Sequence, residues 1–443
     1  MKPLLRFSVP LWTLLVFSAF LKSTRAQNIS NCATGTLNIT TTTTTANVTF
    51  QLDPNCSLTV ENNTSENGLI TGLTPGAVYQ IVLNCSGSCN VSQITTKPET
   101  VSLTVTNITT SSMFVSWTKP VGNSSFYKVQ WTGGGRNVPV NVSETFYNIT
   151  NLTAGVQYEI TVTAVAGDGY TEGQSATVTK YTKPEVVTSL SAVNVTTSSV
   201  FVSWTKPVGN SSFYKVQWTG TSGSVNVYET FYDIPNLTAG VQYEITVTAV
   251  AGDNYTEGQS ATVTNYTKPE VVTSLSAANI TTSSIFVSWT KPVGNSSFYK
   301  VQWTGTSGSV NVYETFYNIT NLTAGVQYEI TVTAVAGDGY TEGQSATVTN
   351  YTKPEVVTSL SAVNVTTSSV FVSWTKPVGN SSFYKVQWTG TSGSVNVYET
   401  FYDIPNLTAG VQYEITVTAV AGDNYTEGQS ATVTNYTKPE VVR

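Results

Sequence analysis

The chain has 443 residues, 10% of them charged, and a formal charge of −6 at neutral pH. This length exceeds that of one compact domain, and the ordinary aromatic and aliphatic content allows several hydrophobic cores. The mild acidity excludes the basic surface by which proteins bind nucleic acid or anionic lipid, so we expect no nucleic-acid partner.

The first 26 residues have the pattern of a secretory signal peptide. Lys2 and Arg6 precede a 15-residue, largely apolar run from Phe7 to Leu21, and the small-residue stretch ending at Ala26 predicts cleavage there. A membrane span needs about 20 apolar residues, so removal is favoured over an uncleaved anchor. Removal takes away four positive charges and moves the formal charge to −10. We therefore expect a protein of the secretory pathway, extracellular or at the cell surface.

Asparagine sequons point to the same compartment. There are 28 Asn-x-Ser/Thr triplets without proline at the middle position, which predicts a heavily N-glycosylated protein. Eight of them recur at two corresponding places in a repeated unit and are the leading glycosylation candidates: Asn107, Asn123, Asn194, Asn210, Asn279, Asn295, Asn364 and Asn380.

Residues 27–97 contain all the cysteines of the chain: Cys32, Cys56, Cys85 and Cys89. An even number in a secreted protein predicts two disulfides, for which three pairings are possible. Cys85 and Cys89 flank a Ser-Gly-Ser turn and could close a hairpin, which would leave Cys32 and Cys56 to staple the front of the segment. Free thiols are less favoured outside the cell, and a metal site is less favoured still because histidine and Cys-x-x-Cys are both absent.

Four units of about 85 residues follow, at 98–183, 184–268, 269–353 and 354–438. Residues 184–268 and 354–438 are identical, whereas 269–353 differs from them at six positions. The identity recurs every second unit, which indicates duplication of a pair. A unit of this size can be a domain in its own right.

Each unit shows apolar residues at alternate positions, the pattern of half-buried strands. In 184–268, Val202 and Trp204 lie in one such run, and Tyr243, Ile245 and Val247 lie in another. Turn-forming clusters separate the runs, and no stretch has helical spacing. Seven or so short strands, each with one apolar face, predict an all-β sandwich of two sheets.

A tyrosine recurs at the start of the last long strand, in the string Asn-Leu-Thr-Ala-Gly-Val-Gln-Tyr. A buried tyrosine needs a partner for its hydroxyl, and the preceding loop is within reach, which predicts the tyrosine corner of Greek-key sandwiches. The expected core residues are one tryptophan and one tyrosine in each unit: Trp117, Tyr158, Trp204, Tyr243, Trp289, Tyr328, Trp374 and Tyr413.

The stretches "SVFVSWTKP", "FYKVQW" and "NLTAGVQYEITVTAV" resemble the second, third and sixth strands of a fibronectin type III domain. The resemblance covers 98–438 and extends more weakly to 27–97, where Tyr79 occupies the corner position. It implies a tandem array of fibronectin type III, immunoglobulin-like β-sandwiches joined by short linkers. An immunoglobulin domain would instead carry a cysteine pair around its tryptophan.

Nothing in the chain indicates catalysis. It contains no histidine, the usual general base and commonest metal ligand, so we expect no enzyme activity within these residues and no cofactor. Asp253 and Glu257 could be read as paired carboxylates, but a solvated hairpin tip explains them better. Arg136 lies in the stretch 133–144 of the first unit, which is two residues longer than its counterparts in the other units. It marks a possible partner-binding loop, against the alternative of drift in a tolerant surface loop.

Residues 439–443 restate the opening of a unit, so we expect a further, truncated unit there. The signal peptide, the threonine-rich sequon-dense modules and the short linkers together resemble the ectodomain of receptor-type tyrosine phosphatases. That resemblance implies an adhesive or ligand-sensing, rod-like spacer array that binds extracellular proteins or glycans. In that family a membrane helix and a cytoplasmic phosphatase domain would lie outside this sequence. The alternative is a secreted structural glycoprotein of matrix or mucus.

Overall fold

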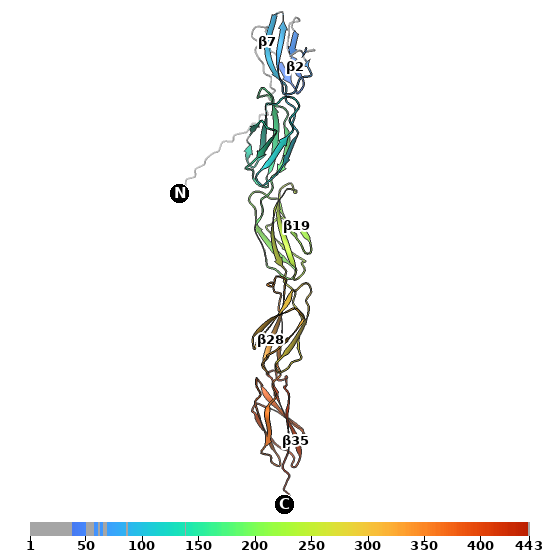
Figure 1. The fold of residues 1–443 in the computed structure, drawn as a ribbon, viewed down its shortest axis with the longest axis vertical. Coiled ribbons are helices and arrows are strands. Elements are labelled where there is room, and N and C mark those ends of the chain that lie inside the picture. The colour runs from blue at the N-terminus through green and yellow to red at the C-terminus, as the bar shows by residue number, and fades with distance from the viewer. Residues whose placement is uncertain are drawn as a thin grey trace, which may run out of the picture. The chain divides into compact units, whose positions relative to one another are not determined.

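The computed structural model describes residues 38–49, 57–60, 63–64, 69–85, 87–137 and 139–441. The predicted signal peptide, Cys32 and Cys56 lie outside them. The chain divides into two compact units. The first comprises Met1–Glu185 with the loops Val208–Ser212 and Val250–Gly258, and the second comprises Val186–Pro207, Phe213–Ala249 and Gln259–Arg443. All regular structure in the described residues is β-strand (Figure 1).

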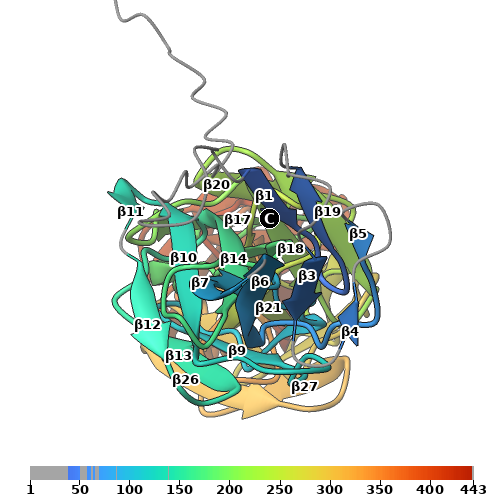
Figure 2. The same ribbon diagram turned by 90° about the horizontal axis from the view of Figure 1, so that it is seen from above.

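The first unit contains two pairs of sheets. Its strands are β1 (Asn38–Thr41), β2 (Ala46–Thr49), β3 (Ser57–Val60), β4 (Asn63–Thr64), β5 (Leu69–Ile70), β6 (Val78–Cys85), β7 (Gly87–Thr95), β8 (Leu103–Thr106), β9 (Met113–Trp117), β10 (Phe126–Gly133), β11 (Arg136–Asn137), β12 (Val140–Val142), β13 (Phe146–Ile149), β14 (Gln157–Val165) and β15 (Ala176–Tyr181). The leading module has the sheets β1-β2-β5 and β4-β3-β6-β7. Sandwich 1 has the sheets β13-β9-β8 and β11-β10-β14-β15, with β12 also paired to β10. Figure 2 shows β10 beside β14, its antiparallel partner.

The second unit contains three sandwiches of the same design. Its strands are β16 (Thr188–Val193), β17 (Val200–Thr205), β18 (Phe213–Trp218), β19 (Gly223–Val227), β20 (Phe231–Ile234), β21 (Gln242–Val250), β22 (Glu257–Tyr266), β23 (Thr273–Ala278), β24 (Ile285–Thr290), β25 (Phe298–Trp303), β26 (Gly308–Val312), β27 (Phe316–Ile319), β28 (Gln327–Val335), β29 (Ala346–Tyr351), β30 (Thr358–Val363), β31 (Val370–Thr375), β32 (Phe383–Trp388), β33 (Gly393–Val397), β34 (Phe401–Ile404), β35 (Gln412–Val420) and β36 (Ala431–Tyr436).

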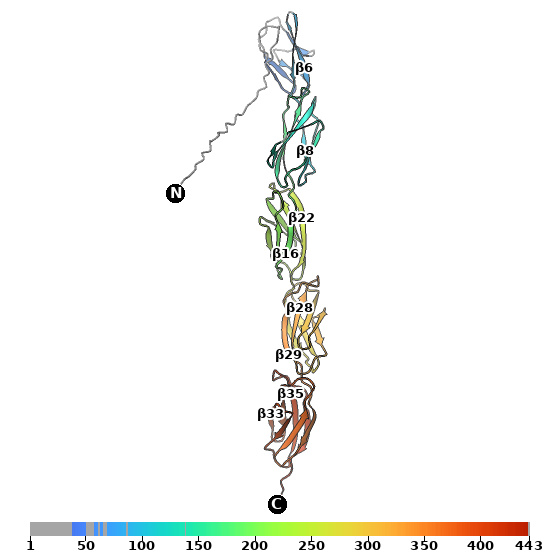
Figure 3. The same ribbon diagram turned by 90° about the vertical axis from the view of Figure 1, so that its left-hand side faces the viewer.

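Sandwiches 2, 3 and 4 begin at β16, β23 and β30, and each pairs a three-stranded sheet with a four-stranded one. In sandwich 3 these sheets are β23-β24-β27 and β26-β25-β28-β29. Strands β28 and β29 lie side by side in antiparallel register (Figure 3). In each sheet, strands from the first half of the unit lie beside strands from its second half, as in a Greek key. The all-β expectation is confirmed.

The core of sandwich 3 lies between its two sheets. Val287 and Trp289 from β24 pack with Val301 from β25 and Ile330 from β28, and all four are buried. Burial of one such aliphatic side chain stabilises the fold by about 1.5–3 kcal/mol, so the alternating pattern selects which face of each strand turns inward. The same set recurs in sandwiches 1, 2 and 4.

The buried tryptophan of each core has one hydrogen-bond donor without a partner among the described residues. In sandwich 3 the ring of Trp289 meets that of Tyr299 edge to face, with centroids 5.3 Å apart. Its indole Nε1 is buried and has no hydrogen-bond partner among the described residues. The second tryptophan of the unit, Trp303, is only half-buried and packs against the core from its edge.

A tyrosine hydroxyl closes each corner, where the chain crosses from one sheet to the other. The Tyr328 side chain is fully buried, and its hydroxyl accepts a hydrogen bond from the Thr323 N–H at 2.8 Å. Equivalent bonds of 2.7–2.9 Å reach Tyr79, Tyr158, Tyr243 and Tyr413.

A linker threonine anchors the same corner in each sandwich. The Thr352 hydroxyl donates to the Thr323 carbonyl at 2.6 Å and accepts from the Val326 N–H at 3.1 Å. Thr352 is fully buried, which ties the start of the linker to the body of sandwich 3.

Candidate binding loops

A loop of nearly constant sequence follows the long strand that begins at the corner tyrosine. Its four copies span residues 166–173, 251–258, 336–343 and 421–428, reading Ala-Gly-Asp-Gly/Asn-Tyr-Thr-Glu-Gly. We call these the tyrosine loops after their central residues: Tyr170, Tyr255, Tyr340 and Tyr425.

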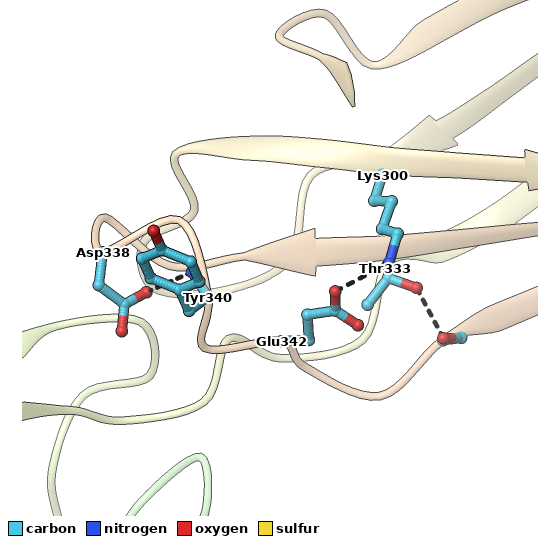
Figure 4. Close-up of polar contacts among 6 residues, drawn as sticks. Lys300, Thr333, Asp338, Tyr340 and Glu342 are labelled. Atoms are coloured by element: carbon cyan, nitrogen blue, oxygen red, sulfur yellow. Dashed lines mark hydrogen bonds and ion pairs between the residues drawn. The ribbon is translucent and has the colours of Figure 1, made fainter. Parts of the chain in front are cut away.

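An aspartate organises each loop from within. In sandwich 3, Asp338 Oδ1 accepts a hydrogen bond from the Tyr340 N–H at 3.0 Å (Figure 4). The same oxygen accepts a second bond from the Thr341 N–H at 2.9 Å. Asp338 Oδ2 accepts a third bond from the Thr341 hydroxyl at 2.6 Å. This aspartate turn mimics a backbone turn and satisfies two amide donors that a loop would otherwise expose. The other copies repeat it with distances of 2.6–3.1 Å.

The environment of this carboxylate favours its charged form. Partial burial by itself would raise the pKa of Asp338, but the hydrogen bonds from Thr341 and Tyr340 outweigh that effect and lower the pKa below its ordinary 3.8. The same balance lowers the pKa of Asp168, Asp253 and Asp423. The loops are therefore held by charge-assisted hydrogen bonds at neutral pH.

Two backbone positions explain the small residues around the aspartate. Gly339 has φ of 77° and Asn254 has φ of 64°, the left-handed region that glycine and asparagine tolerate best. At Gly343 an added Cβ would come within 2.4 Å of the Pro269 carbonyl oxygen, so only glycine allows the loop to approach the first residues of its own sandwich.

The geometry presents the tyrosine ring to solvent. Tyr340 is 88% exposed, and the other three loop tyrosines are each 87% exposed. At the base of the loop Lys300 Nζ lies 3.1 Å from Glu342 Oε1 (Figure 4). The two side chains are 32% and 47% exposed, so solvent screens this ion pair, which contributes at most about 1 kcal/mol and mainly orders the loop base. The Thr333 hydroxyl lies 2.6 Å from that of Ser345 and joins the strands on either side of the loop.

Metal-ligating clusters and surface hollows are the other candidate sites among the described residues. Among the described residues no group of three metal-ligating side chains gathers, and the sequence has no histidine. Shallow hollows of about 560 and 550 Å³ open on sandwiches 4 and 3; the second is lined by Trp303, Gly308 and Glu329, among others. Each hollow is lined by serine and threonine hydroxyls and by one glutamate, Glu414 in sandwich 4 and Glu329 in sandwich 3.

Asp253 lies in the loop between the neighbouring strands β21 and β22, and Glu257 begins β22, as the hairpin-tip interpretation expects. Asp253 has a further role within this loop. Asp253 accepts hydrogen bonds from the Tyr255 and Thr256 N–H groups and from the Thr256 hydroxyl. It is a structural carboxylate that shapes the loop. The spacing of Asp two residues before Tyr and three before Thr carried the signal, because an aspartate turn needs donors at those positions.

The other predicted site residues are spread over the sandwiches. The eight glycosylation candidates are all exposed: Asn107, Asn123, Asn194, Asn210, Asn279, Asn295, Asn364 and Asn380. The backbone of Arg136 belongs to β11 and pairs with Gly133. In the backbone register of the β6–β7 hairpin, Cys85 lies opposite Gly87 and Cys89 lies opposite Leu83. The disulfide connectivity stays a prediction.

The comparison with protein families decides the identity of the repeated unit. The model of the fibronectin type III domain matches residues 96–180, 183–265, 268–350 and 353–435. The chain belongs to the fibronectin type III family. Among the described residues no helix has the length and apolarity to cross a membrane.

Similar fibronectin type III arrays occur in receptors and in tenascins. Receptor-type tyrosine-protein phosphatase eta of Gallus gallus is 33% identical over 420 residues, covering 89% of this chain and 30% of that protein. Receptor-type tyrosine-protein phosphatase H of Homo sapiens is 30% identical over 408 residues, covering 84% of this chain and 35% of that protein. Tenascin-R of Homo sapiens is 26% identical over 342 residues, covering 72% of this chain and 25% of that protein. The chain therefore spans only 25–35% of the length of these relatives.

Proposed function

We propose that the chain is the extracellular, N-glycosylated part of a receptor-type tyrosine phosphatase and acts as an adhesive or ligand-sensing array. The similarity to receptor-type tyrosine-protein phosphatase eta, 33% identity over 89% of the chain, supports the receptor class. The predicted signal peptide and the 28 sequons support the compartment. In this proposal the phosphatase activity belongs to a cytoplasmic domain outside these residues, and the short proline-containing linkers make the array a spacer.

The observation that carries the binding role is the tyrosine loop. Tyrosine supplies a large amphipathic surface with few rotatable bonds and is enriched among residues that dominate protein interfaces. Asp338 already fixes the backbone around Tyr340, so a partner need not order the loop on binding. We infer that the tyrosine loops recognise extracellular proteins.

The charge of the loop supports a protein partner over a cation. The Asp338 carboxylate oxygens are occupied by Tyr340 and Thr341, and Glu342 is paired with Lys300. The loop therefore offers a tyrosine ring and hydroxyl at its tip instead of free carboxylates.

Cell binding by the soluble, fluorescently labelled chain tests the proposal. The test variant replaces the four loop tyrosines by alanine: Tyr170, Tyr255, Tyr340 and Tyr425. The control replaces three tyrosines that lie outside these loops and are 76–77% exposed: Tyr228, Tyr313 and Tyr398. We expect cell binding to be lost in the test variant and retained in the control. Retained binding in the test variant rejects the loops as the binding site.

A second candidate is a secreted structural glycoprotein of the extracellular matrix, favoured by the similarity to Tenascin-R. Sequencing the transcript beyond the codon for Arg443 separates the two. A membrane span of about 20 apolar residues followed by a His-Cys phosphatase signature supports the receptor. A stop codon after fibronectin modules alone supports the structural protein.

A further inference from the structure

The two kinds of unit differ in a pattern that concerns glycosylation. Residues 184–268 and 269–353 differ at six positions. Three are exchanges among aliphatic residues: Val193 and Ala278, Val195 and Ile280, Val200 and Ile285. The other three are Asp233 and Asn318, Pro235 and Thr320, and Asn254 and Gly339. These three remove one sequon and create another.

One of the two sequons lies on the tyrosine loop. Asn254-Tyr255-Thr256 is a sequon, whereas Gly339 occupies the corresponding position in the next unit. Asn254 is exposed, and its φ of 64° resembles the 77° of Gly339, so the two residues occupy the same left-handed position. Asn424 repeats Asn254, and Gly169 repeats Gly339.

The other sequon lies at the end of a strand in the smaller sheet. Asn318, on β27, is exposed and starts the sequon Asn318-Ile319-Thr320. In the preceding unit the same position on β20 is Asp233, and Pro235 replaces the threonine. Asn148 repeats Asn318, and Asp403 repeats Asp233.

The pairing of the two exchanges favours a sugar over a purely conformational role for Asn254. A left-handed backbone alone would explain asparagine in place of glycine. It would not explain why a sequon on another sheet is lost in the same units by two substitutions, at Asp233 and Pro235. Conservation of the number of sequons in each unit, with a change in their position, accounts for all three differences.

We propose that Asn254 and Asn424 carry N-linked oligosaccharides, so that the tyrosine loops alternate between sugar-bearing and bare along the array. The bare loops are those of Tyr170 and Tyr340. In the modification the side-chain amide nitrogen bonds to the anomeric carbon of a lipid-linked oligosaccharide. The bond from that carbon to the lipid pyrophosphate breaks, the pyrophosphate leaves, and the amide nitrogen loses one proton.

Resting on the proposed function, this alternation assigns recognition to sandwiches 1 and 3. A branched oligosaccharide attached next to Tyr255 or Tyr425 excludes a protein partner from the ring, whereas Tyr170 and Tyr340 follow a glycine that carries no sugar. The partner is therefore an extracellular protein that recognises a bare tyrosine loop, that of Tyr170 or of Tyr340.

Glycopeptide mass spectrometry on the full secreted chain tests the sugar directly. Cleavage after glutamate releases residues 245–257 with Asn254 as the sole sequon, and the matched bare peptide 160–172 differs only by Gly169. After enzymatic removal of glycans, the mass of the peptide is expected to show aspartate at position 254 in place of asparagine. The peptide that contains Asn424 has the same sequence, so in the Asn254→Gly variant this peptide signal comes from Asn424 only. Unmodified asparagine in these peptides overturns the proposal whatever the chain binds.

Cell binding then separates the inference from the proposed function. Gly169→Asn with Gly339→Asn creates the sugar-bearing loop in sandwiches 1 and 3, because Thr171 and Thr341 complete the sequons. We expect binding to fall to the level of Tyr170→Ala with Tyr340→Ala and to return after enzymatic glycan removal. If the new sites are glycosylated and binding persists while the alanine variant loses it, the shielding is wrong and the binding loop stands. If the alanine variant also binds, the loop function itself fails.

Discussion

Replacing Tyr328 by phenylalanine removes a single oxygen atom from the corner of sandwich 3. That oxygen is buried and accepts the Thr323 N–H at 2.8 Å. A buried donor left without a partner costs about 1–3 kcal/mol. Thr323 itself lies at the surface, so water can reach part of the freed group, and we expect a loss of about 1–2 kcal/mol. In a domain of this size that loss lowers the Tm by roughly 4–16 °C.

The assay is urea unfolding of residues 268–353, which carry their own hydrophobic core. Both the midpoint and the slope of the unfolding curve are read, because an unchanged slope shows that only stability has moved. Tyr340→Phe is the matched control: the same oxygen is removed from a side chain that is 88% exposed, and the expected change is below about 0.5 kcal/mol. If Tyr328→Phe unfolds at the same urea concentration as the control, the corner hydrogen bond has no net role.

Three further outcomes follow from the loop and the linker. Because the pKa of Asp338 is lowered on folding, its contribution is complete above pH 3.8 and is lost as the pH falls through the folded pKa. Asp338→Asn should flatten the stability of sandwich 3 measured across that acid range; an unchanged profile contradicts the argument. Thr352→Val breaks the 2.6 Å bond to the Thr323 carbonyl and should cost about 1–3 kcal/mol in urea unfolding, whereas a neutral result would show that water replaces it. Gly343→Ala places a Cβ against the Pro269 carbonyl and should lower the Tm, and no change would mean that the loop moves aside freely.

The strands and the corner were predictable because burial of one face leaves a direct mark on the sequence. Tyr328, Ile330 and Val332 alternate with exposed residues at the start of β28 because each inward position must enter the core. The corner tyrosine was recognisable for a related reason, since a polar atom in that row needs a nearby donor.

The tyrosine loop was not predicted, because its order comes from local hydrogen bonds and not from burial. Asp253 and Tyr255 lie in a polar stretch with no hydrophobic period, and such stretches are read as solvated turns by default. Only the spacing of Asp253 from the Tyr255 and Thr256 donors distinguishes an organised loop from a plain tip.

The most direct test of the tyrosine loops as a binding site is photocrosslinking on intact cells. A photoreactive phenylalanine analogue replaces Tyr340 in the otherwise unchanged chain, or replaces the similarly exposed Tyr313 as a control. If the tyrosine loops bind the partner, illumination joins the Tyr340 variant to a cell-surface protein and leaves the Tyr313 variant uncoupled. Cells that bind both variants equally, with crosslinks at Tyr313 and none at Tyr340, would contradict it.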